Sequence, residues 1–291
     1  MANTLNTISG DLIAQRALEF LTAKYPLISL IANDFSDQPV NFGQNIITRL
    51  NTMPSASAFN PAVGYVAGNV TSQNVTVTLD KHIYTAVEFS EQELSSTNIN
   101  LIDEMGSSLA YSIGDAVMAE IAALLISGNY ANSTTVPLTA FNRVNAIVKP
   151  KAALATRKVS NGLVLCVSPE AEGKLWEDDS LVSLVFNKQG SVEAVNLPDV
   201  HGVKIAGFAG LPAGLNGVVL SKDALVFASR TPQIESDVVN GIVKNVSNEQ
   251  GLSIQYRKYH DPKLGKVVIG YTVMFGVAKA NTVAAQLLKQ S

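Results

Sequence analysis

Residues 73–94, QNVTVTLDKHIYTAVEFSEQEL, alternate between apolar and polar side chains. The apolar ones stand at odd positions, from Val75, Val77 and Leu79 to Val87 and Phe89. This period of two predicts a half-buried strand of about fifteen residues. Such a strand would span roughly 50 Å, more than the core of a compact chain of this size requires. We therefore expect a ribbon that reaches beyond the body of the protein.

A long helix is predicted from Asn100 to Ser127, and Gly128 and Asn129 supply its end. At ~1.5 Å per residue it would be roughly 40 Å long. Its apolar residues recur at helical spacing and predict the face that packs into the core. The candidate core residues are Ile102, Met105, Leu109, Ile113, Val117 and Ile121.

Other helices have local signals. Residues 9–24 are amphipathic, and Ser90 with Glu93 fits a capping box before a short helix. A further helix is predicted over residues 139–158, with an interruption at Lys149-Pro150, because proline lacks the N–H that a helix interior needs.

Short elements follow residue 160. LVLCV at 163–167 predicts a buried strand, and Ser168 predicts a helix cap after it. Two more strand patterns lie within residues 202–212 and 217–229, so residues 160–240 are typical of a compact α/β module. Residues 252–259 and 266–280 predict an antiparallel pair around a turn.

Residues 40–73 form a tract rich in Asn, Ser, Ala, Gly and Pro that carries one charge, Arg49. Its apolar residues are too few to fold alone, yet Phe59, Tyr65 and Val66 are unusual in a solvated linker. We expect this tract and the strand after it to form an extended arm.

The composition is poor in charge. Charged residues make up 15% of the 291 residues and hydrophobic ones 47%, where about 25% charged is usual. Either the protein is a monomer with an uncharged surface, or it covers much of its surface with copies of itself. The second alternative is favoured, because large interfaces between subunits are depleted of charge.

The net charge of −3, without a basic stripe, argues against a protein whose main task is to bind nucleic acid. The single cysteine, Cys166, suits a reducing compartment. The N-terminal segment has no signal-type apolar run, and no segment is long and apolar enough for a membrane helix. We expect a cytosolic chain with no membrane partner.

No catalytic, metal or cofactor site is predicted. His82, His201 and His260 lie in unrelated contexts, without metal-ligand spacing. Cys166 sits in an apolar strand, where a thiol usually serves as a small hydrophobic residue. Phosphate-loop and nucleophile-elbow motifs are absent. We therefore expect no enzymatic activity; a soluble metabolic enzyme with a site within 160–220 is the remote alternative.

The order of VNFGQNIITRL (40–50), SQNVTVTLDKHIYTAVEFSEQEL (72–94), the long helix and the closing strand pair resembles the major capsid proteins of tailed bacteriophages. The resemblance implies an α+β fold of the Hong Kong 97 type. It divides the chain into an N-terminal arm (1–39), an extended E-loop with its return strand (40–90), and a P-domain with the spine helix (91–159). An α/β A-domain (160–242) and C-terminal strands that return to the P-domain (243–291) complete it.

The resemblance implies a capsid protein that assembles through pentamers and hexamers into an icosahedral shell around double-stranded DNA, in the cytoplasm of the host bacterium. The long ribbon would then be completed by a neighbouring subunit. Scaffolding, portal and decoration proteins would be partners, and DNA would be contacted weakly and without sequence specificity. The candidate subunit-interface residues are Phe42, Arg49, Phe59, Tyr65, Val66, Val75 and Val77.

The sequence also departs from some members of that family. Some weld their subunits through a lysine in the E-loop, but residues 40–73 contain no lysine, so no covalent cross-link is expected. Some carry a long scaffold-like extension before the loop, which this sequence does not match. An encapsulin-type bacterial nanocompartment, which has the same fold and holds an enzyme cargo, is the nearer alternative.

Overall fold

The computed structural model describes most of the chain from residue 72 onward and scattered positions before it. The described residues are 15, 17–19, 28, 32–33, 43, 45–51, 56, 58–59, 61–62, 64–65, 72–96, 101–160, 162–179, 181, 199–233, 241–247 and 252–291. Of the helix predicted over residues 9–24, only Gln15 and residues 17–19 are described. These are helical, and Ala17 and Leu18 are buried.

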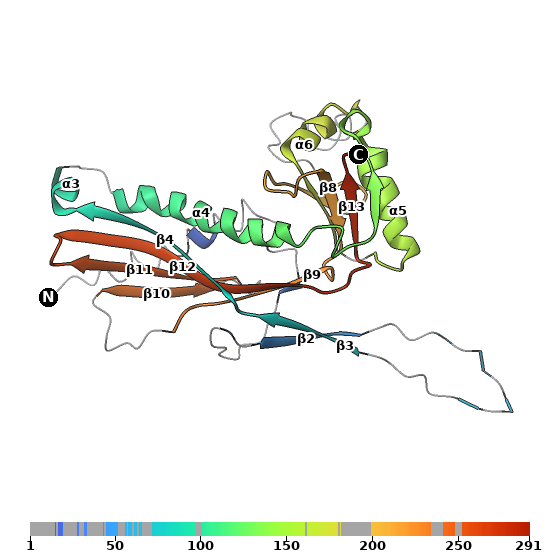
Figure 1. The fold of residues 1–291 in the computed structure, drawn as a ribbon, viewed down its shortest axis with the longest axis horizontal. Coiled ribbons are helices and arrows are strands. Elements are labelled where there is room, and N and C mark those ends of the chain that lie inside the picture. Colours follow the sequence, from blue (N-terminus) through green and yellow to red (C-terminus); the bar gives the residue numbers. More distant parts are fainter. Residues whose placement is uncertain are drawn as a thin grey trace.

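A long, mostly antiparallel sheet forms one half of the body (Figure 1). Its strands run in the order β1-β9-β12-β11-β10, and β4 also pairs with β12. The strands are β1 (Ala32–Asn33), β4 (Lys81–Ser90), β9 (Leu225–Arg230), β10 (Ile242–Ser247), β11 (Ser253–Asp261) and β12 (Lys266–Lys279). The predicted antiparallel pair near the C-terminus is confirmed as β11 and β12.

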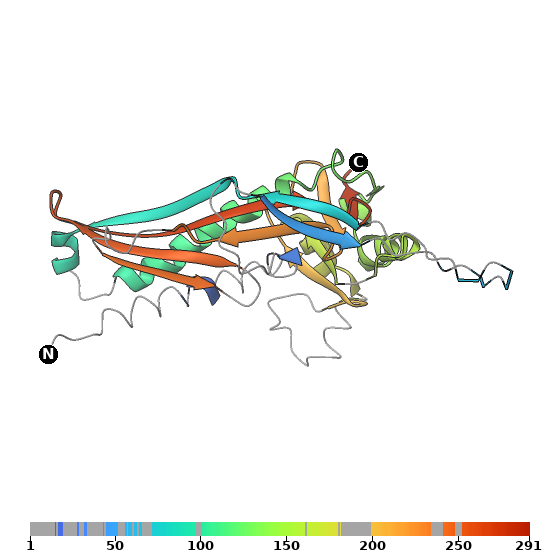
Figure 2. The ribbon, with the colours of Figure 1, turned by 90° about the horizontal axis from the view of Figure 1, so that it is seen from below.

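Helix α4 (Leu101–Ala123) lies along one face of this sheet, as Figures 1 and 2 show. On β4 the odd residues face the helix and the even residues, from His82 to Glu88, face away and are exposed. Leu109, Ile113 and Val117 of α4 are buried against the sheet. The short helix α3 (Glu91–Ser96) joins β4 to this layer.

A second sheet, with strand order β5-β13-β8-β6-β7, forms the other half of the body. The strands are β5 (Ser133–Thr135), β6 (Leu163–Val167), β7 (Val203–Gly207), β8 (Leu215–Leu220) and β13 (Ala285–Lys289). Two helices, α5 (Lys149–Thr156) and α6 (Pro169–Trp176), pack beside it. One face shares its core with α4 and the long sheet, and the other packs on the two helices.

The helix predicted over residues 139–158 is divided differently from the prediction. A 3₁₀ turn, η1 (Leu138–Ala140), precedes a π-helix, η2 (Val144–Val148), and α5 follows without a gap. Pro150 therefore stands in the first turn of α5, where its missing N–H needs no partner. The chain changes helix type here instead of breaking.

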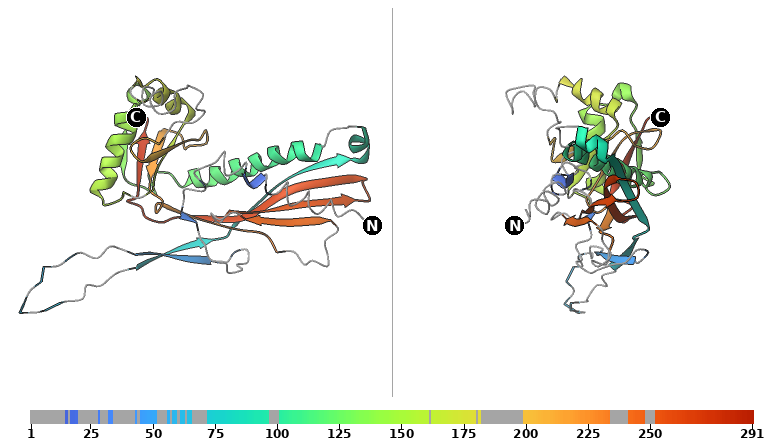
Figure 3. Two further views of the ribbon diagram at one scale, coloured as in Figure 1. Left: turned by 180° about the vertical axis from the view of Figure 1, so that it is seen from behind. Right: turned by 90° about the vertical axis from the view of Figure 1, so that its left-hand side faces the viewer.

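The arm consists of β2 (Asn45–Asn51) and β3 (Ser72–Thr78), which pair in antiparallel register from Asn45 with Thr78 to Asn51 with Ser72. In Figures 1 and 3 this ribbon lies on the side of the long sheet away from α4. At its base the N–H of Gly43 donates to the carbonyl of Leu79, 2.8 Å away. The arm is thus a separate two-stranded element.

The prediction of one long strand over residues 75–89 is wrong in its continuity. The chain forms two strands, β3 and β4, with a break at Leu79-Asp80. Strand β3 pairs with β2, whereas β4 pairs with β12 over its whole length. The partners of this ribbon therefore come from the same chain.

The two sheets do not follow the predicted domain boundaries, because each takes strands from more than one of the predicted domains. Strand β9 lies within 160–242 but belongs to the long sheet. Strand β13 lies within 243–291 but belongs to the second sheet, as does β5 from 91–159. The C-terminal segment thus enters the long sheet through β12 and ends in the other sheet.

Candidate functional site

The arm and the open face of the long sheet both expose large apolar side chains. At the tip of the arm, Phe59 is 58% exposed and Tyr65 is 94% exposed. Their ring centroids lie 4.9 Å apart with planes tilted by 40°. Because the exposure of aromatic rings to water is unfavourable, such a pair is typical of a contact surface for another protein.

The base of the arm is buried by the chain itself. Val75 is 6% exposed and Val77 is fully buried. They pack with Leu79 against Val226 and Ala228 of β9. The prediction that Val75 and Val77 contact a neighbouring subunit is therefore wrong, because their surface is already covered. Alternation identified the apolar face correctly but not the residues that cover it.

The other predicted interface residues fall at or beyond the edge of the description. Phe42 and Val66 lie outside the described residues, and Arg49 is placed in β2 without a described side chain. Ile102 and Met105 lie in α4, and their side chains are likewise outside the description. The four other candidate core residues of the helix are buried within the chain: Leu109, Ile113, Val117 and Ile121.

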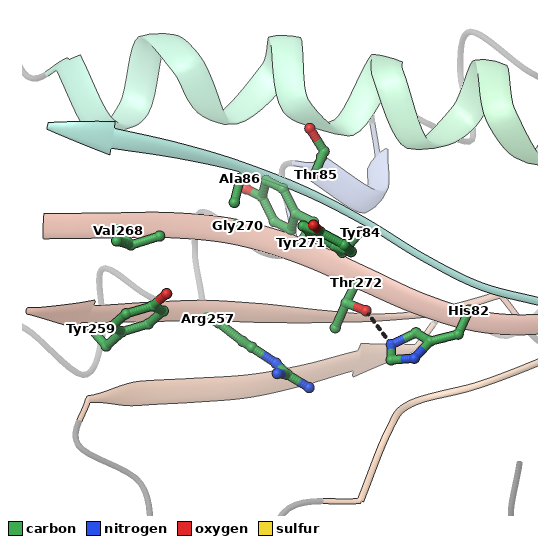
Figure 4. Close-up of a pocket in the computed structure, with 10 residues that line it drawn as sticks. All are labelled: His82, Tyr84, Thr85, Ala86, Arg257, Tyr259, Val268, Gly270, Tyr271 and Thr272. Carbon is green, nitrogen blue, oxygen red and sulfur yellow. Dashed lines mark hydrogen bonds between the residues drawn. The ribbon is translucent and has the colours of Figure 1, made fainter. Parts of the chain in front are cut away.

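The open face of the long sheet carries a hollow of ≈ 280 Å³ that the sequence analysis missed (Figure 4). Tyr84 of β4 is 77% exposed, and Tyr259 and Arg257 of β11 line the same hollow. Between them Gly270 has no side chain, and a Cβ there would lie 2.7 Å from the carbonyl oxygen of Thr85. The signal in the sequence was the pair of tyrosines at solvent-facing positions of the two strands.

Two polar side chains of this hollow, His82 and Thr272, are hydrogen-bonded to each other. Nε2 of His82 lies 2.8 Å from Oγ1 of Thr272, as drawn in Figure 4. That hydroxyl donates its own proton to the carbonyl of Ile83, 3.0 Å away. Since the hydroxyl proton is held by a backbone carbonyl and not by a base, Thr272 is not arranged as a nucleophile.

The buried thiol of Cys166 is likewise unsuited to catalysis. It lies in β6 with 1% exposure, and burial raises the pKa of the thiol to about 12. A thiol in that state does not supply the thiolate that nucleophilic chemistry needs. Among the described residues, no group of three or more His, Cys, Asp or Glu side chains could hold a metal ion.

Charged side chains gather at the far end of the long sheet, where β4 meets the β11–β12 turn. Nζ of Lys266 lies 2.6 Å from a carboxylate oxygen of Glu88, and Nε2 of His260 lies 2.9 Å from one of Glu91. The hydrogen bond and the charge of Glu88 raise the pKa of Lys266. Because these groups are largely exposed, the pairs align the sheet edge and add little stability.

No helix within the described part of the chain is long and apolar enough to cross a membrane.

The fold is similar to those of solved capsid structures. A structure from Gordonia phage Cozz is 16% identical and has a TM-score of 0.59, with 90% of this chain and 85% of that chain covered. The capsid of Ralstonia phage GP4 is 10% identical at a TM-score of 0.59, with coverage of 86% and 83%. A virus-like particle from Pyrococcus furiosus is 9% identical at a TM-score of 0.55, with coverage of 96% and 98%. No protein-family model and no curated protein matches the sequence.

The chain has the phage capsid fold. The resemblance drawn from the strand and helix patterns is thereby confirmed at the level of the fold, as is its mixed α and β character. The similarity to these capsid structures extends over both sheets of the chain, because the matches cover 85% or more of its length.

Proposed function

We propose that this protein is the major capsid protein of a tailed bacteriophage, a structural shell subunit and not an enzyme. The observation that carries the proposal is the whole-chain capsid fold, found in phage capsid structures at coverage of 86% to 90% of this chain. A projecting arm with exposed aromatic residues at its tip supports it, because an isolated monomer gains nothing from that arm.

In this proposal the long sheet with α4 is the P-domain and its spine helix, and the second sheet with α5 and α6 is the A-domain. The β2–β3 ribbon with its tip is the E-loop, and residues 1–39 are the N-terminal arm. Strands β9 and β13 then cross between the two domains. The A-domains would cluster at the centres of pentamers and hexamers.

The contacts between subunits are assigned first to the exposed tip of the arm, where Phe59 and Tyr65 would pack on a neighbouring subunit. Phe42, Arg49 and Val66 remain proposed contact residues, whereas the buried Val75 and Val77 do not. Many modest contacts of this kind become effectively intramolecular once some have formed, so the shell closes cooperatively. Ordering the arm would be part of the cost of assembly.

The shell would enclose double-stranded DNA in a phage that assembles in the host cytoplasm. A net charge of −3 supports weak contact with DNA that is independent of sequence, because tight binding requires clustered basic side chains. Portal and scaffolding proteins, and a decoration protein, are the proposed partners. No cofactor is assigned.

A second candidate is the shell of an encapsulin-type nanocompartment. The likeness to a virus-like particle from Pyrococcus furiosus, over 96% of this chain, favours it. Both candidates assemble into closed shells, and they differ in their contents. Purified particles that contain a portal and DNA identify a phage capsid, and particles that contain an enzyme cargo identify a compartment.

Light scattering and negative-stain microscopy of the expressed chain test the proposal. We expect closed particles, alone or with the assembly factors. A chain that stays monomeric at every concentration, even with those factors present, would refute the capsid role.

Deletion of residues 52–68 tests the arm: we expect a folded subunit that forms no closed shells. Normal particles from the deletion variant would contradict the assignment of the arm.

A further inference from the structure

A tight turn precedes β7 at the edge of the second sheet. The N–H of Val200 donates to the carbonyl of Val203 at 3.1 Å, and the reverse bond is 2.9 Å. His201 and Gly202 form the turn between them with φ of 53° and 72°. Positive φ at both central positions is the type I′ geometry. This backbone conformation is energetically unfavourable for an L-residue such as His201. The fold therefore holds the imidazole in place at a cost in conformational energy.

Two cationic side chains converge on this turn. Nη1 of Arg143 lies 3.4 Å from Nε2 of His201, and Nζ of Lys151 donates to the carbonyl oxygen of His201. Arg143 caps the π-helix η2, and Lys151 lies in the first turn of α5. Because the guanidinium has only donors, Nε2 of His201 is the acceptor in this contact.

Among the described residues, no carboxylate forms an ion pair with either cation. The carboxylate of Asp178 accepts from the backbone N–H of Arg143 at 2.7 Å. Within the described part of the chain, no ion pair involves Arg143 or Lys151. Nε of Arg143 is buried and has no hydrogen-bond partner there. A buried charged donor without an acceptor is costly, and the rest of this guanidinium is partly exposed, where an acceptor from solution can reach it.

We propose that Arg143, Lys151 and His201 form a binding site for a phosphate group. The guanidinium can form paired hydrogen bonds to two phosphate oxygens, and the Lys151 ammonium adds a second charge. A π-helix segment is frequent at functional sites, and here η2 begins directly after Arg143. The ligand is free phosphate or the phosphate of a small ester. This site is independent of the capsid role.

The only tryptophan of the chain offers a reporter. Trp176 ends α6 and lies two residues before Asp178, whose carboxylate contacts the backbone of Arg143. Titration of the full chain with inorganic phosphate, followed by tryptophan fluorescence and by calorimetry, is compared with chloride at equal ionic strength. We expect saturable binding of phosphate and none of chloride. A response to chloride equal to that of phosphate, or none to phosphate, would overturn the site.

Three variants assign the binding to these residues. Arg143→Met and Lys151→Met should each weaken phosphate binding about ten-fold, the cost of a lost charge-assisted hydrogen bond. His201→Asn should keep the turn, since Asn tolerates positive φ, and weaken binding less. Lys149→Met removes the same charge at an exposed position of α5 and should change the affinity by less than about two-fold.

Equal losses in Lys149→Met and Lys151→Met would reduce the effect to general surface charge and reject the site. If Arg143→Met does not fold by circular dichroism, Lys151→Met decides. A nucleoside monophosphate in place of phosphate separates the two sources. Equal affinity assigns the site to the phosphate of an ester, and loss of binding restricts it to free phosphate.

Discussion

Gly276 lies in β12 where β3 approaches the long sheet. A Cβ at this position would overlap the carbonyl oxygen of Thr78 and come within 2.8 Å of its carbonyl carbon. It would also lie 3.0 Å from a methyl group of Val77. The glycine is therefore required for the base of the arm to dock, because backbone atoms cannot move aside as a flexible side chain can.

Gly276→Ala should lower the free energy of unfolding by about 1–3 kcal/mol, the usual cost of overpacking. Gly173→Ala is the matched control. Gly173 is exposed inside α6 with nothing within 4 Å of an added Cβ, so alanine should stabilise by about 0.5–1 kcal/mol. Urea unfolding of both variants checks the opposite signs. A stable Gly276→Ala protein would show that the arm is not docked as described.

Local residue patterns predicted local contacts well at this scale. The capping box is confirmed: the N–H of Ser90 donates to Glu93 at 2.8 Å, and the N–H of Glu93 donates to Oγ of Ser90 at 3.2 Å. The cap at Ser168 is confirmed as well. Both involve residues three apart. The cover of Val77 comes from β9, about 150 positions later, and no local pattern carries that information.

At the scale of the element, the capping box of α3 should make stability depend on pH. Hydrogen bonds from the backbone and then the side chain of Ser90 lower the pKa of Glu93. A lowered folded-state pKa means that the contribution is complete above the unfolded value of about 4.3 and is lost as the pH falls through the folded value.

Glu93→Gln isolates this contribution, since its side-chain oxygen still accepts but does not titrate. We expect the difference in free energy of unfolding between wild type and variant to be constant from about pH 6 to 7. It should shrink as the pH falls below about 4.3. Urea denaturation over a pH series measures it. A difference that persists unchanged to about pH 3 would contradict the capping role.

Helix α4 should tolerate charge on one face only. Ile113 is 3% exposed, and Ile113→Asp would bury an unpaired carboxylate at a cost of several kcal/mol, enough to abolish folding. Ser112→Asp introduces the same residue at the neighbouring exposed position and should change the stability by less than about 0.5 kcal/mol. Circular dichroism and soluble yield compare the two. Equal behaviour would contradict the burial of this face.

The alternation of buried and exposed residues across the break between β3 and β4 explains why the sequence predicted one strand. Val75, Val77 and Leu79 are buried, and the odd residues of β4 keep facing inward after Asp80. The alternation of burial therefore continues across the break unchanged. At Asp80 the pairing partner changes from β2 to β12. Hydrophobic periodicity carries no information about which strand is the partner.

At the scale of the whole molecule, the sequence predicted the succession of elements better than their sharing between sheets. The strands β9 and β13 are both buried runs, LVFASR and AQLLK. Nothing in either run tells which sheet it joins, because a buried strand is apolar on both faces in either place. The whole-chain capsid fold was accessible only through the order of the parts. The hollow at Tyr84 is formed by β4 together with the β11–β12 pair, which lies far from β4 in the sequence.

The tip of the arm is where assembly and subunit stability should separate. Phe59 and Tyr65 contact each other and are exposed, so they contribute little to the fold of one chain. Phe59→Asp or Tyr65→Asp should leave the urea midpoint of the subunit unchanged within about 0.5 kcal/mol. Both should reduce closed particles severely, because each interface would bury an unpaired carboxylate.

Tyr65→Phe is the matched control for this experiment. It keeps the ring and its contact area and removes only the hydroxyl, so particles should form as in wild type. Light scattering measures assembly, and urea unfolding at concentrations below assembly measures the subunit. Equal losses in both measurements would place the two aromatic residues in the core of the subunit. Intact shells from both Asp variants would mean that neighbouring subunits do not cover the tip.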